Sequence, residues 1–401
     1  MKAIDIHYKE EYSVYILVLC IGLFFCYISF PDSKKPTFII YAGTLLLAMA
    51  CIYLSEISEN KKVSFCFFWL GLAALGYPMA FRLPAVDDLS YQDIFNQANY
   101  YNLSSYFKAS GVENGYLLLN WFFCRFIDNE YNHFQAFCAY ITFVIWGIAF
   151  RRNSNHKGNI MFMVLFLWSH LYFFVLSAGL IRIFMSLSMS YIALQYIWKD
   201  QWKIFLLWIV LASFIHLSSL ILLLFLFFYY KRKLFYDHWI LFVFLTFFIV
   251  LFSLIGMAQF LVPILGDRYE GYGNVDAIDF SLGSFTTLPI WIACYYYYKT
   301  LSSVSVDYRK KYVIGMILIS LSIIFSIASS AVHVGRIIFY AYLGLLIVIS
   351  SIFQIRTRTI SDMILKCLLI IYPIVYVMVT TLTNQSQSRL FPYQSFLTDS
   401  M

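Results

Sequence analysis

Apolar stretches occupy most of the chain, and the charged residues cluster in short groups between them. A helix needs about 20 mostly apolar residues to cross the hydrocarbon core of a bilayer. Most of the stretches are near that length, so they predict a succession of membrane-spanning helices. The apolar runs are 12–30, 37–54, 63–80, 131–150, 160–177, 180–198, 203–230, 239–261, 284–298, 312–331, 336–353 and 362–382.

The composition leads to the same conclusion. Of the 401 residues, 62% are hydrophobic and 12% are charged, whereas roughly a quarter of the residues in a soluble domain carry a charge. The pattern predicts an all-α, polytopic integral membrane protein and excludes a soluble enzyme. The net charge is +7, but no basic patch is large enough to bind nucleic acid.

Two further sequence features bear on disulfide bonds, metal binding and a signal peptide. The eight cysteines lie almost entirely within apolar runs and form no CxxC pair, so we expect neither disulfide bonds nor a metal site. Lys2 and Lys9 precede the run 12–30, and no small-residue cleavage site follows it. We interpret this run as the first membrane span and not as a removed signal peptide.

Two segments are ambiguous. Residues 116–127 are too short to cross a bilayer, so we place them as a helix at the outer membrane interface. The run 203–230 is either one long tilted span or two short half-crossings that turn near His216. Loops rich in Lys and Arg stay in the cytoplasm, and only the second alternative keeps 231–233 and 309–311 there. This topology predicts about 12 to 13 transmembrane helices with the C-terminus outside.

In this topology lysine predominates among the inner cations and arginine among the outer ones. The rule that positive loops stay in the cytoplasm is enough to explain the lysines on the inner side. The planar guanidinium of arginine can hold a phosphate or a carboxylate with two hydrogen bonds. The alternative is that each outer arginine pairs with a lipid phosphate or extends to the interface from the end of a span.

The outer loops are longer than the inner ones. We interpret the chain, 1–401, as one membrane-embedded domain with two long outer segments. The first is 81–130, which includes the interfacial helix, and the second is 264–283. The inner loops are short and carry no glycine-rich nucleotide motif. We therefore expect the function to lie on the outer face.

The acidic candidates lie in the first outer segment. Asp87 and Asp88 open it, and adjacent carboxylates can hold a sugar hydroxyl or act as a general base. Glu113 precedes the interfacial helix, where a carboxylate also suits the helix N-terminus. Capping is therefore the structural alternative for all three residues. Tyr91 and Tyr116 could stack on sugar rings or belong to an interfacial aromatic belt.

The basic candidates lie at the outer ends of spans. Arg182 lies close to the start of an apolar span, where an ionisable group is costly and indicates function. His216 lies within an apolar run, where packing is the alternative role. Arg268 and Tyr269 lie in the second outer segment, and Arg336 lies at the outer end of the run 336–353. Cations that hold a phosphate and a base that deprotonates a hydroxyl suit glycosyl transfer from a lipid phosphate.

Short motifs connect these candidates. The chain has Asp87-Asp88-x-x-Tyr91, then Glu113-Asn114-Gly115-Tyr116-Leu117-Leu118-Leu119-Asn120, and after Arg182 it has Ile215-His216-Leu217-Ser218-Ser219-Leu220. With the Arg268-Tyr269 loop, these motifs resemble the EpsG family of polysaccharide polymerases, relatives of the Wzy O-antigen polymerases. The resemblance covers residues 60–345.

The resemblance implies a helical fold in the bacterial cytoplasmic (inner) membrane, with the active site facing the periplasm. Such enzymes join undecaprenyl-pyrophosphate-linked oligosaccharide repeat units into the O-antigen of lipopolysaccharide or a related surface polysaccharide. No metal, nucleotide or other cofactor is implied. The implied partners are the lipid-linked donor and acceptor and membrane lipid, with a chain-length regulator as an open addition.

The roles that follow from the resemblance are hypotheses. Arg182, Arg268 and Arg336 would bind the pyrophosphate and stabilise its developing charge. Asp88 or Glu113 would be the base on the acceptor hydroxyl, and His216 would orient the pyrophosphate or replace that base. The residues that would contact the pyrophosphate or glycan also include Asp87, Tyr91, Tyr116 and Tyr269.

Two alternatives remain at this stage. One is a glycosyltransferase that uses a polyprenyl-phosphate monosaccharide, whose single phosphate needs fewer arginines. The other is a lipid-linked oligosaccharide flippase, which would carry charged residues deep along a two-sided cavity. The candidate charges gather at one face of the membrane, which favours an enzyme.

Overall fold

The structure is a computed structural model, and its regular secondary structure is helical throughout the residues that it describes. These residues are 2–83, 86–153, 159–172, 180–230, 237–241, 243–244, 287–302, 306–327, 332–355, 357 and 359–383. Among them, five helices are long and apolar enough to cross a membrane, and shorter apolar helices accompany them. The prediction of an all-α polytopic membrane protein is confirmed.

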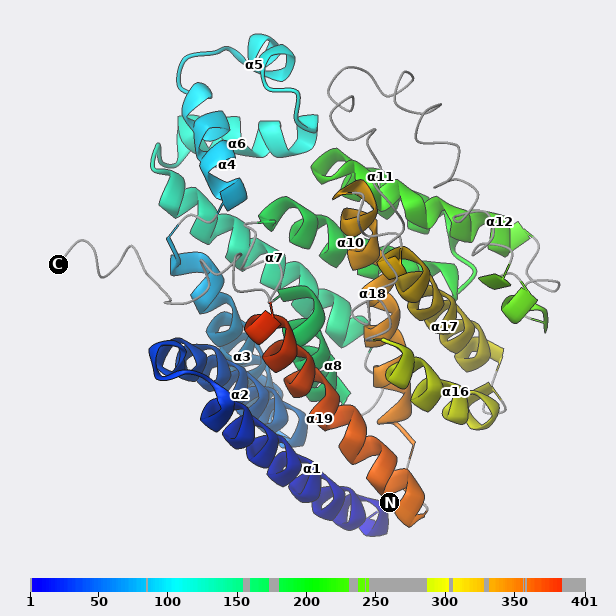
Figure 1. Cartoon of the computed structure of the whole chain (residues 1–401). Helices are drawn as coiled ribbons and strands as arrows, with labels where there is room; N and C mark the ends of the chain where they lie inside the picture. The colour runs from blue at the N-terminus through cyan, green and yellow to red at the C-terminus, as the bar shows by residue number, and fades with distance from the viewer. Residues whose placement is uncertain are drawn as a thin grey trace. The chain divides into compact units, whose positions relative to one another are not determined.

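The chain divides into two compact units. The first contains residues 1–189, 210–217 and 353–401, and the second contains 190–209 and 218–352. The helices are α1 (Lys2–Ser29), α2 (Lys35–Ile57), α3 (Lys61–Phe81), α4 (Val86–Gln97), α5 (Leu103–Ala109), α6 (Asn114–Phe126), α7 (Tyr131–Asn153), α8 (Asn159–Leu167), α10 (Ile181–Ile197), α11 (Trp202–Ile215), α12 (Leu224–Tyr230), α16 (Leu288–Ser302), α17 (Val306–Ile327), α18 (Val332–Ile352) and α19 (Ile360–Thr383). Figure 1 shows their course.

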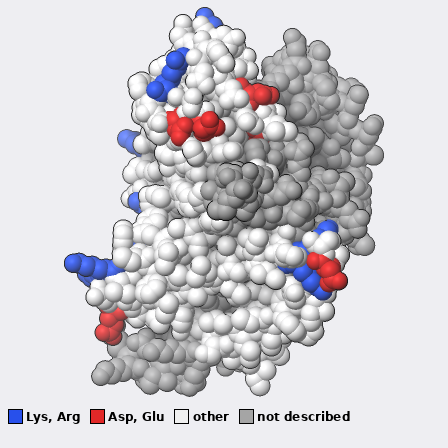
Figure 2. Space-filling view, turned by 90° about the vertical axis from the view of Figure 1, so that its left-hand side faces the viewer, with Lys and Arg blue, Asp and Glu red and all other residues white. Residues whose placement is uncertain are grey.

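Long helices form the body of the first unit. Helix α2 packs along α3, α3 along α7, and α1 along α19. One side of α1 carries large apolar side chains that are exposed, including Leu17 at 59%, Phe24 at 60% and Phe25 at 64%. Charged side chains on the face of the molecule in Figure 2 form small separate groups with broad uncharged surface between them. Such a surface suits contact with lipid.

The first outer segment is more structured than a loop. Besides α6, which matches the helix expected over 116–127, it contains the helices α4 and α5. Figure 1 shows these three helices gathered where α3 ends and α7 begins. Asn102 caps α5 by accepting a 2.9 Å hydrogen bond from the amide of Ser105. The hydroxyl of Tyr106 donates to the carbonyl of Ile94 in α4 at 2.8 Å, so α4 and α5 are fastened together.

Two predicted spans differ from the helices that the structure describes. In the run 160–177, α8 continues as a π-helix, η2 (Trp168–Tyr172), and the remaining residues lie outside the described part. Most of the run 239–261 and all of the second outer segment, 264–283, also lie outside it. A π-helical turn places one extra residue in the helix and is common near functional sites.

The run 203–230 is broken near His216. Helix α11 ends at Ile215, a 3-10 helix η3 (Leu217–Leu223) follows, and α12 begins at Leu224. Lys310 of α17 forms an ion pair with Asp200 at 2.5 Å, which requires both residues to lie on the same side of the membrane. If every other run crosses once, a single crossing at 203–230 would place them on opposite sides. The ion pair therefore supports the two half-crossings.

Helices α17 and α18 of the second unit make a close glycine contact. A Cβ atom added to Gly344 would lie 2.5 Å from the carbonyl oxygen of Gly315. Only a residue without a side chain allows the two backbones to approach this closely, and small residues serve this purpose in membrane helices. Trp291 of α16 also reaches α17, where its indole nitrogen donates to the hydroxyl of Ser320 at 2.8 Å.

Candidate active site

The carboxylate of Glu113 joins three helices of the first unit. Glu113 is the residue before α6, but its side chain does not cap that helix. Instead, one carboxylate oxygen forms an ion pair with Arg182, at the start of α10, and accepts a hydrogen bond from its Nη1. The other oxygen accepts a 3.1 Å hydrogen bond from the amide of Leu217, just beyond α11. Arg182 and Leu217 thus each hold one oxygen of the Glu113 carboxylate in place.

Two tyrosine rings surround the guanidinium of Arg182. Its central carbon lies 4.7 Å from the ring centroid of Tyr91 and 5.4 Å from that of Tyr116. The rings themselves are 5.8 Å apart and meet edge to face. Arg182 is 6% exposed, and its Nε has no hydrogen-bond partner among the described residues. The rings hold the cation in place, and it keeps a donor for a further acceptor.

The helix that follows Glu113 is seated directly on the end of α11. A Cβ atom added to Gly115 would lie 2.6 Å from the carbonyl oxygen and 2.7 Å from the Cβ of Phe214. Any larger residue would push the two segments apart. The glycine therefore sets the short distance across which Glu113 reaches the amide of Leu217.

His216 lies where α11 ends and is 5% exposed. Its amide closes the last turn by donating to the carbonyl of Ala212 at 2.9 Å. The hydroxyl of Ser186 in α10 donates to that same carbonyl at 3.0 Å. This end of α11 is thus attached to α10, and the histidine is close enough to Glu113 to act on its charge.

The electrostatics of Glu113 follow from these contacts. Burial alone would raise the pKa of its carboxyl group, but the charges of Arg182 and His216 and the hydrogen bond from Leu217 together lower it below the usual value of 4.5. Glu113 is therefore ionised at neutral pH. It is also a weaker base than a free carboxylate for as long as Arg182 is its partner.

A second ion pair lies deeper in the first outer segment. Asp88 of α4 is fully buried and pairs with Nη1 of Arg82, which directly follows α3. The hydroxyl of Tyr131 lies 3.4 Å from the other carboxylate oxygen, and Gln135 donates to the carbonyl of Arg82 at 2.9 Å. These contacts tie the segment to α3 and α7. In the structure, the contacts of Asp88 therefore fix the position of Arg82.

The structure brings five of the residues proposed from the sequence into one cluster in the first unit. They are Tyr91, Glu113, Tyr116, Arg182 and His216. Both tyrosine rings are buried, at 5% and 1% exposure, and face the arginine. Both rings contact the guanidinium of Arg182, whereas the sequence suggested that they stack on sugar rings.

The other proposed residues lie elsewhere. Asp88 forms its separate pair with Arg82, and Arg336 lies on α18 of the second unit. Arg268 and Tyr269 lie outside the described residues, as does the side chain of Asp87. Among the described residues, no group of three or more His, Cys, Asp or Glu is placed to hold a metal ion.

Sequence reasoning did not identify three residues that shape this region. Arg82 is not among the sequence candidates, although an arginine just beyond an apolar run and six residues before an aspartate is a signal for an ion pair. Gly115 belongs to the motif that begins at Glu113, but the motif alone gives it no role. Tyr131 was assigned to the start of a span, and no local pattern connects it with Asp88.

These features define a multi-pass membrane protein with a conformationally fixed arginine–carboxylate site beside the end of a broken apolar helix. The family model of the EpsG family matches residues 62–395. The chain therefore belongs to the EpsG family, which is a Wzy-like polymerase family. No curated protein and no solved structure matches the chain.

Proposed function

We propose that this protein polymerises undecaprenyl-pyrophosphate-linked oligosaccharide repeat units into O-antigen or a related surface polysaccharide. The reaction takes place at the periplasmic face of the bacterial cytoplasmic membrane, without a metal ion. Membership of the EpsG family supports polymerase activity in general. The cluster around Arg182 and Glu113 supports the chemistry, because it combines a cation for a phosphate with a carboxylate for a hydroxyl.

The contact that carries the proposal is the ion pair between Glu113 and Arg182. A carboxylate bound to a guanidinium has little tendency to take up a proton. An incoming pyrophosphate competes for the same guanidinium, because arginine binds phosphate oxygens as readily as carboxylate oxygens. Binding of the donor therefore removes the partner of Glu113 and makes it a stronger base. The base becomes active only when the donor is in place.

The reaction then follows from these positions. The acceptor is the hydroxyl at the non-reducing end of a new lipid-linked unit, and its oxygen attacks the anomeric carbon of the growing chain. The bond between that carbon and the pyrophosphate oxygen breaks, and the pyrophosphate leaves with the electron pair. Glu113 takes the proton of the acceptor hydroxyl. Arg182 stabilises the charge that develops on the leaving group.

The remaining residues have supporting roles in this proposal. His216 orients the pyrophosphate beside Glu113, and it is the alternative base. The rings of Tyr91 and Tyr116 hold the guanidinium of Arg182 in place while its partner is exchanged. Asp88 maintains the shape of the outer segment through Arg82. The base of choice is therefore Glu113, which is 22% exposed, whereas Asp88 is completely buried.

The test is polymerisation by the purified protein supplied with its lipid-linked repeat unit. Glu113→Gln keeps the shape of the side chain and an acceptor for Leu217 but cannot take up the proton. A positioned base contributes about 10²–10⁴-fold in rate, so the variant should lose that much activity. Glu130→Gln is the matched control, since Glu130 is exposed in the same outer segment. Excess chelator should leave the wild-type rate unchanged.

An experiment in living cells tests the alternative that the protein is a flippase. A strain that carries Glu113→Gln should still present single repeat units on its outer surface, because flipping precedes polymerisation. Loss of these surface units would mean that the protein acts in export. Normal polymer from Glu113→Gln would remove Glu113 as the base and leave His216 as the next candidate.

A further inference from the structure

A turn in the first outer segment exposes two neighbouring tyrosines. Residues 98–102 connect α4 to α5. Tyr101 is 42% exposed and Tyr100 is 84% exposed, more than any other large hydrophobic side chain that the structure describes. Burial stabilises a fold in proportion to the apolar area removed from water, so Tyr100 contributes little to folding. Both side chains are open to a ligand.

Side chains of α6 fix the backbone of the 98–102 turn. Arg125 donates a 2.9 Å hydrogen bond to the carbonyl of Asn99. The indole nitrogen of Trp121 donates to the carbonyl of Tyr101 at 3.3 Å, and the thiol of Cys124 donates to the side-chain oxygen of Asn99 at 3.1 Å. The tyrosines are thus presented on a preorganised support, which lowers the cost of binding a ligand.

The chemistry of this surface indicates the kind of ligand. Residues 96–105 carry no charge, and their exposed polar side chains are those of Asn96, Asn99, Asn102, Ser104 and Ser105. Amides and hydroxyls both donate and accept hydrogen bonds, and a tyrosine ring adds a flat apolar face. A sugar ring offers the complement, since it carries hydroxyl groups around apolar C–H faces. The surface therefore fits a glycan better than a phosphate or an acidic peptide.

The lipid-facing surface of the segment lies on α6 instead. Leu118, Phe122 and Phe126 are 48%, 50% and 68% exposed. Residues four apart share one face of a helix, so these three form an apolar stripe that suits the membrane interface. The 98–102 turn has asparagines beside its tyrosines, where the stripe has only apolar side chains. This difference favours a ligand in water over lipid at the turn.

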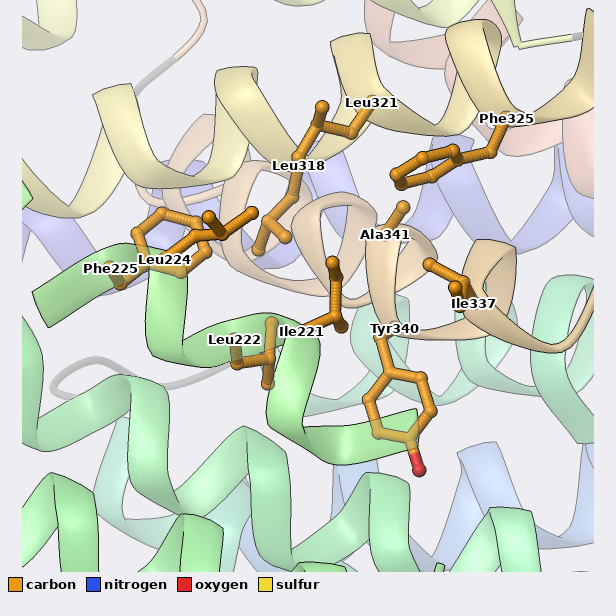
Figure 3. A pocket seen from close by; sticks show the side chains of 10 residues that line it. All are labelled: Ile221, Leu222, Leu224, Phe225, Leu318, Leu321, Phe325, Ile337, Tyr340 and Ala341. Atoms are coloured by element: carbon orange, nitrogen blue, oxygen red, sulfur yellow. The ribbon is translucent and has the colours of Figure 1, made fainter. Parts of the chain in front are cut away.

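A pocket in the second unit is no alternative site for a glycan. Figure 3 shows its lining, in which apolar side chains of η3, α12, α17 and α18 converge. Its cavity volume is about 20 Å³, which is close to the space that one water molecule needs. A sugar ring does not fit there.

Helix α4 connects the 98–102 turn with the candidate active site. Tyr91, whose ring contacts Arg182, lies on α4 six residues before its last residue, Gln97. At 1.5 Å per residue, that distance is roughly 9 Å along the helix axis. A glycan whose reacting end lies at Arg182 therefore needs only a short length of chain to reach the turn.

We propose that the 98–102 turn binds sugars of the growing chain away from the reacting bond and thereby controls chain length. This inference rests on the proposed function for the identity of the glycan. The growing chain changes its carrier in every round, and a second contact keeps it at the protein during the exchange. Such a contact raises the effective concentration of the chain at the active site. The turn thus determines how many units are added before the chain dissociates.

The first experiment measures glycan binding by the full-length protein in lipid nanodiscs. The probe is the surface polysaccharide of the producing strain, freed of lipid and phosphate by mild acid. The double variant Tyr100→Ala/Tyr101→Ala should bind it about tenfold more weakly, because two aromatic contacts are lost. The bonds from α6 to the turn remain, since they go to backbone carbonyls and Asn99. Tyr230→Ala is the matched control, as Tyr230 is 67% exposed but lies in the second unit.

The second experiment measures the length of the polymer. Most of a change in affinity appears in the dissociation rate, so the chains made by the double variant should be up to about tenfold shorter. The product should shift from long chains to short ones. Glu113→Gln should instead reduce the total amount of product, as would a general folding defect.

A spin label on Tyr100→Cys, in a cysteine-free background, distinguishes a glycan site from a lipid contact. The label should be accessible to a water-soluble nickel complex, and protection by the bilayer would overturn the site. Wild-type glycan affinity or wild-type chain length in the double variant would also overturn it. Glycan binding is measured without turnover. A protein that binds glycan through the turn but whose Glu113→Gln variant polymerises normally would therefore retain this site and lose the proposed mechanism.

Discussion

The ion pair between Arg182 and Glu113 predicts a large difference between single and double substitutions. Arg182→Gln leaves the carboxylate of Glu113 without its cation, although that carboxylate is only 22% exposed and the arginine is 6% exposed. Removing one partner of a buried pair costs about 3–5 kcal/mol. The partial exposure of Glu113 reduces this to about 2–3 kcal/mol. The double variant with Glu113→Gln removes both charges, so it should be more stable than Arg182→Gln alone.

The measurement is a double-mutant cycle on the free energy of unfolding in lipid bicelles. We expect a coupling energy of about 2 kcal/mol between Arg182 and Glu113. Arg309 and Asp237 provide the control, because they form an ion pair at 2.9 Å but are 40% and 45% exposed. Such exposed pairs contribute about 0–1 kcal/mol.

One result would refute this reasoning. If the coupling between Arg182 and Glu113 were no larger than that between Arg309 and Asp237, burial would not strengthen the first pair. The claim that Arg182 weakens Glu113 as a base until a phosphate replaces it would then have no energetic basis. Circular dichroism of each variant before unfolding establishes that the comparison is between folded proteins.

The remaining predictions concern packing, topology and pH. Gly115→Ala should destabilise the protein by about 1–3 kcal/mol because its Cβ would overlap Phe214, whereas Gly43→Ala, with nothing within 4 Å, should not; equal unfolding energies would contradict the close contact. In a cysteine-free background, Lys233→Cys should resist an impermeant thiol reagent added outside intact spheroplasts, and labelling would overturn the topology. The folded state lowers the pKa of Glu113, so its contribution to stability is present above pH 4.5 and is lost as the pH falls below that value. The free energy of unfolding measured across this range should therefore fall more steeply with decreasing pH for wild type than for Glu113→Gln. Parallel curves would contradict the lowered pKa of Glu113.

The membrane helices were predictable because their length and apolar character are local properties of the sequence. The helices α4 and α5 were not, because their segment has the polar composition of a loop and its helices are fixed by tertiary contacts such as that between Tyr106 and Ile94. The break near His216 was foreseen as one of two alternatives. Positive charge in the flanking loops favoured it, and the pair between Lys310 and Asp200 supports it.

The candidate site was only partly predictable. Its charged members could be identified singly, because an ionisable residue at the end of an apolar span is unusual. Their pairing could not, since Glu113 and Arg182 are 69 residues apart in the chain and meet only after several helices have packed. For the same reason the sequence left Asp88 and Glu113 equivalent as bases, whereas burial distinguishes them in the structure.

The hydrogen bond from the Leu217 amide to Glu113 satisfies the backbone where the apolar helix α11 stops. A helix that stops inside an apolar run leaves backbone groups without helical partners, and each needs another partner. Glu113 supplies one such partner. Aspartate is one methylene shorter and would reach either Arg182 or Leu217, but not both. The length of the glutamate side chain therefore lets one carboxylate satisfy both Arg182 and the backbone at the helix break.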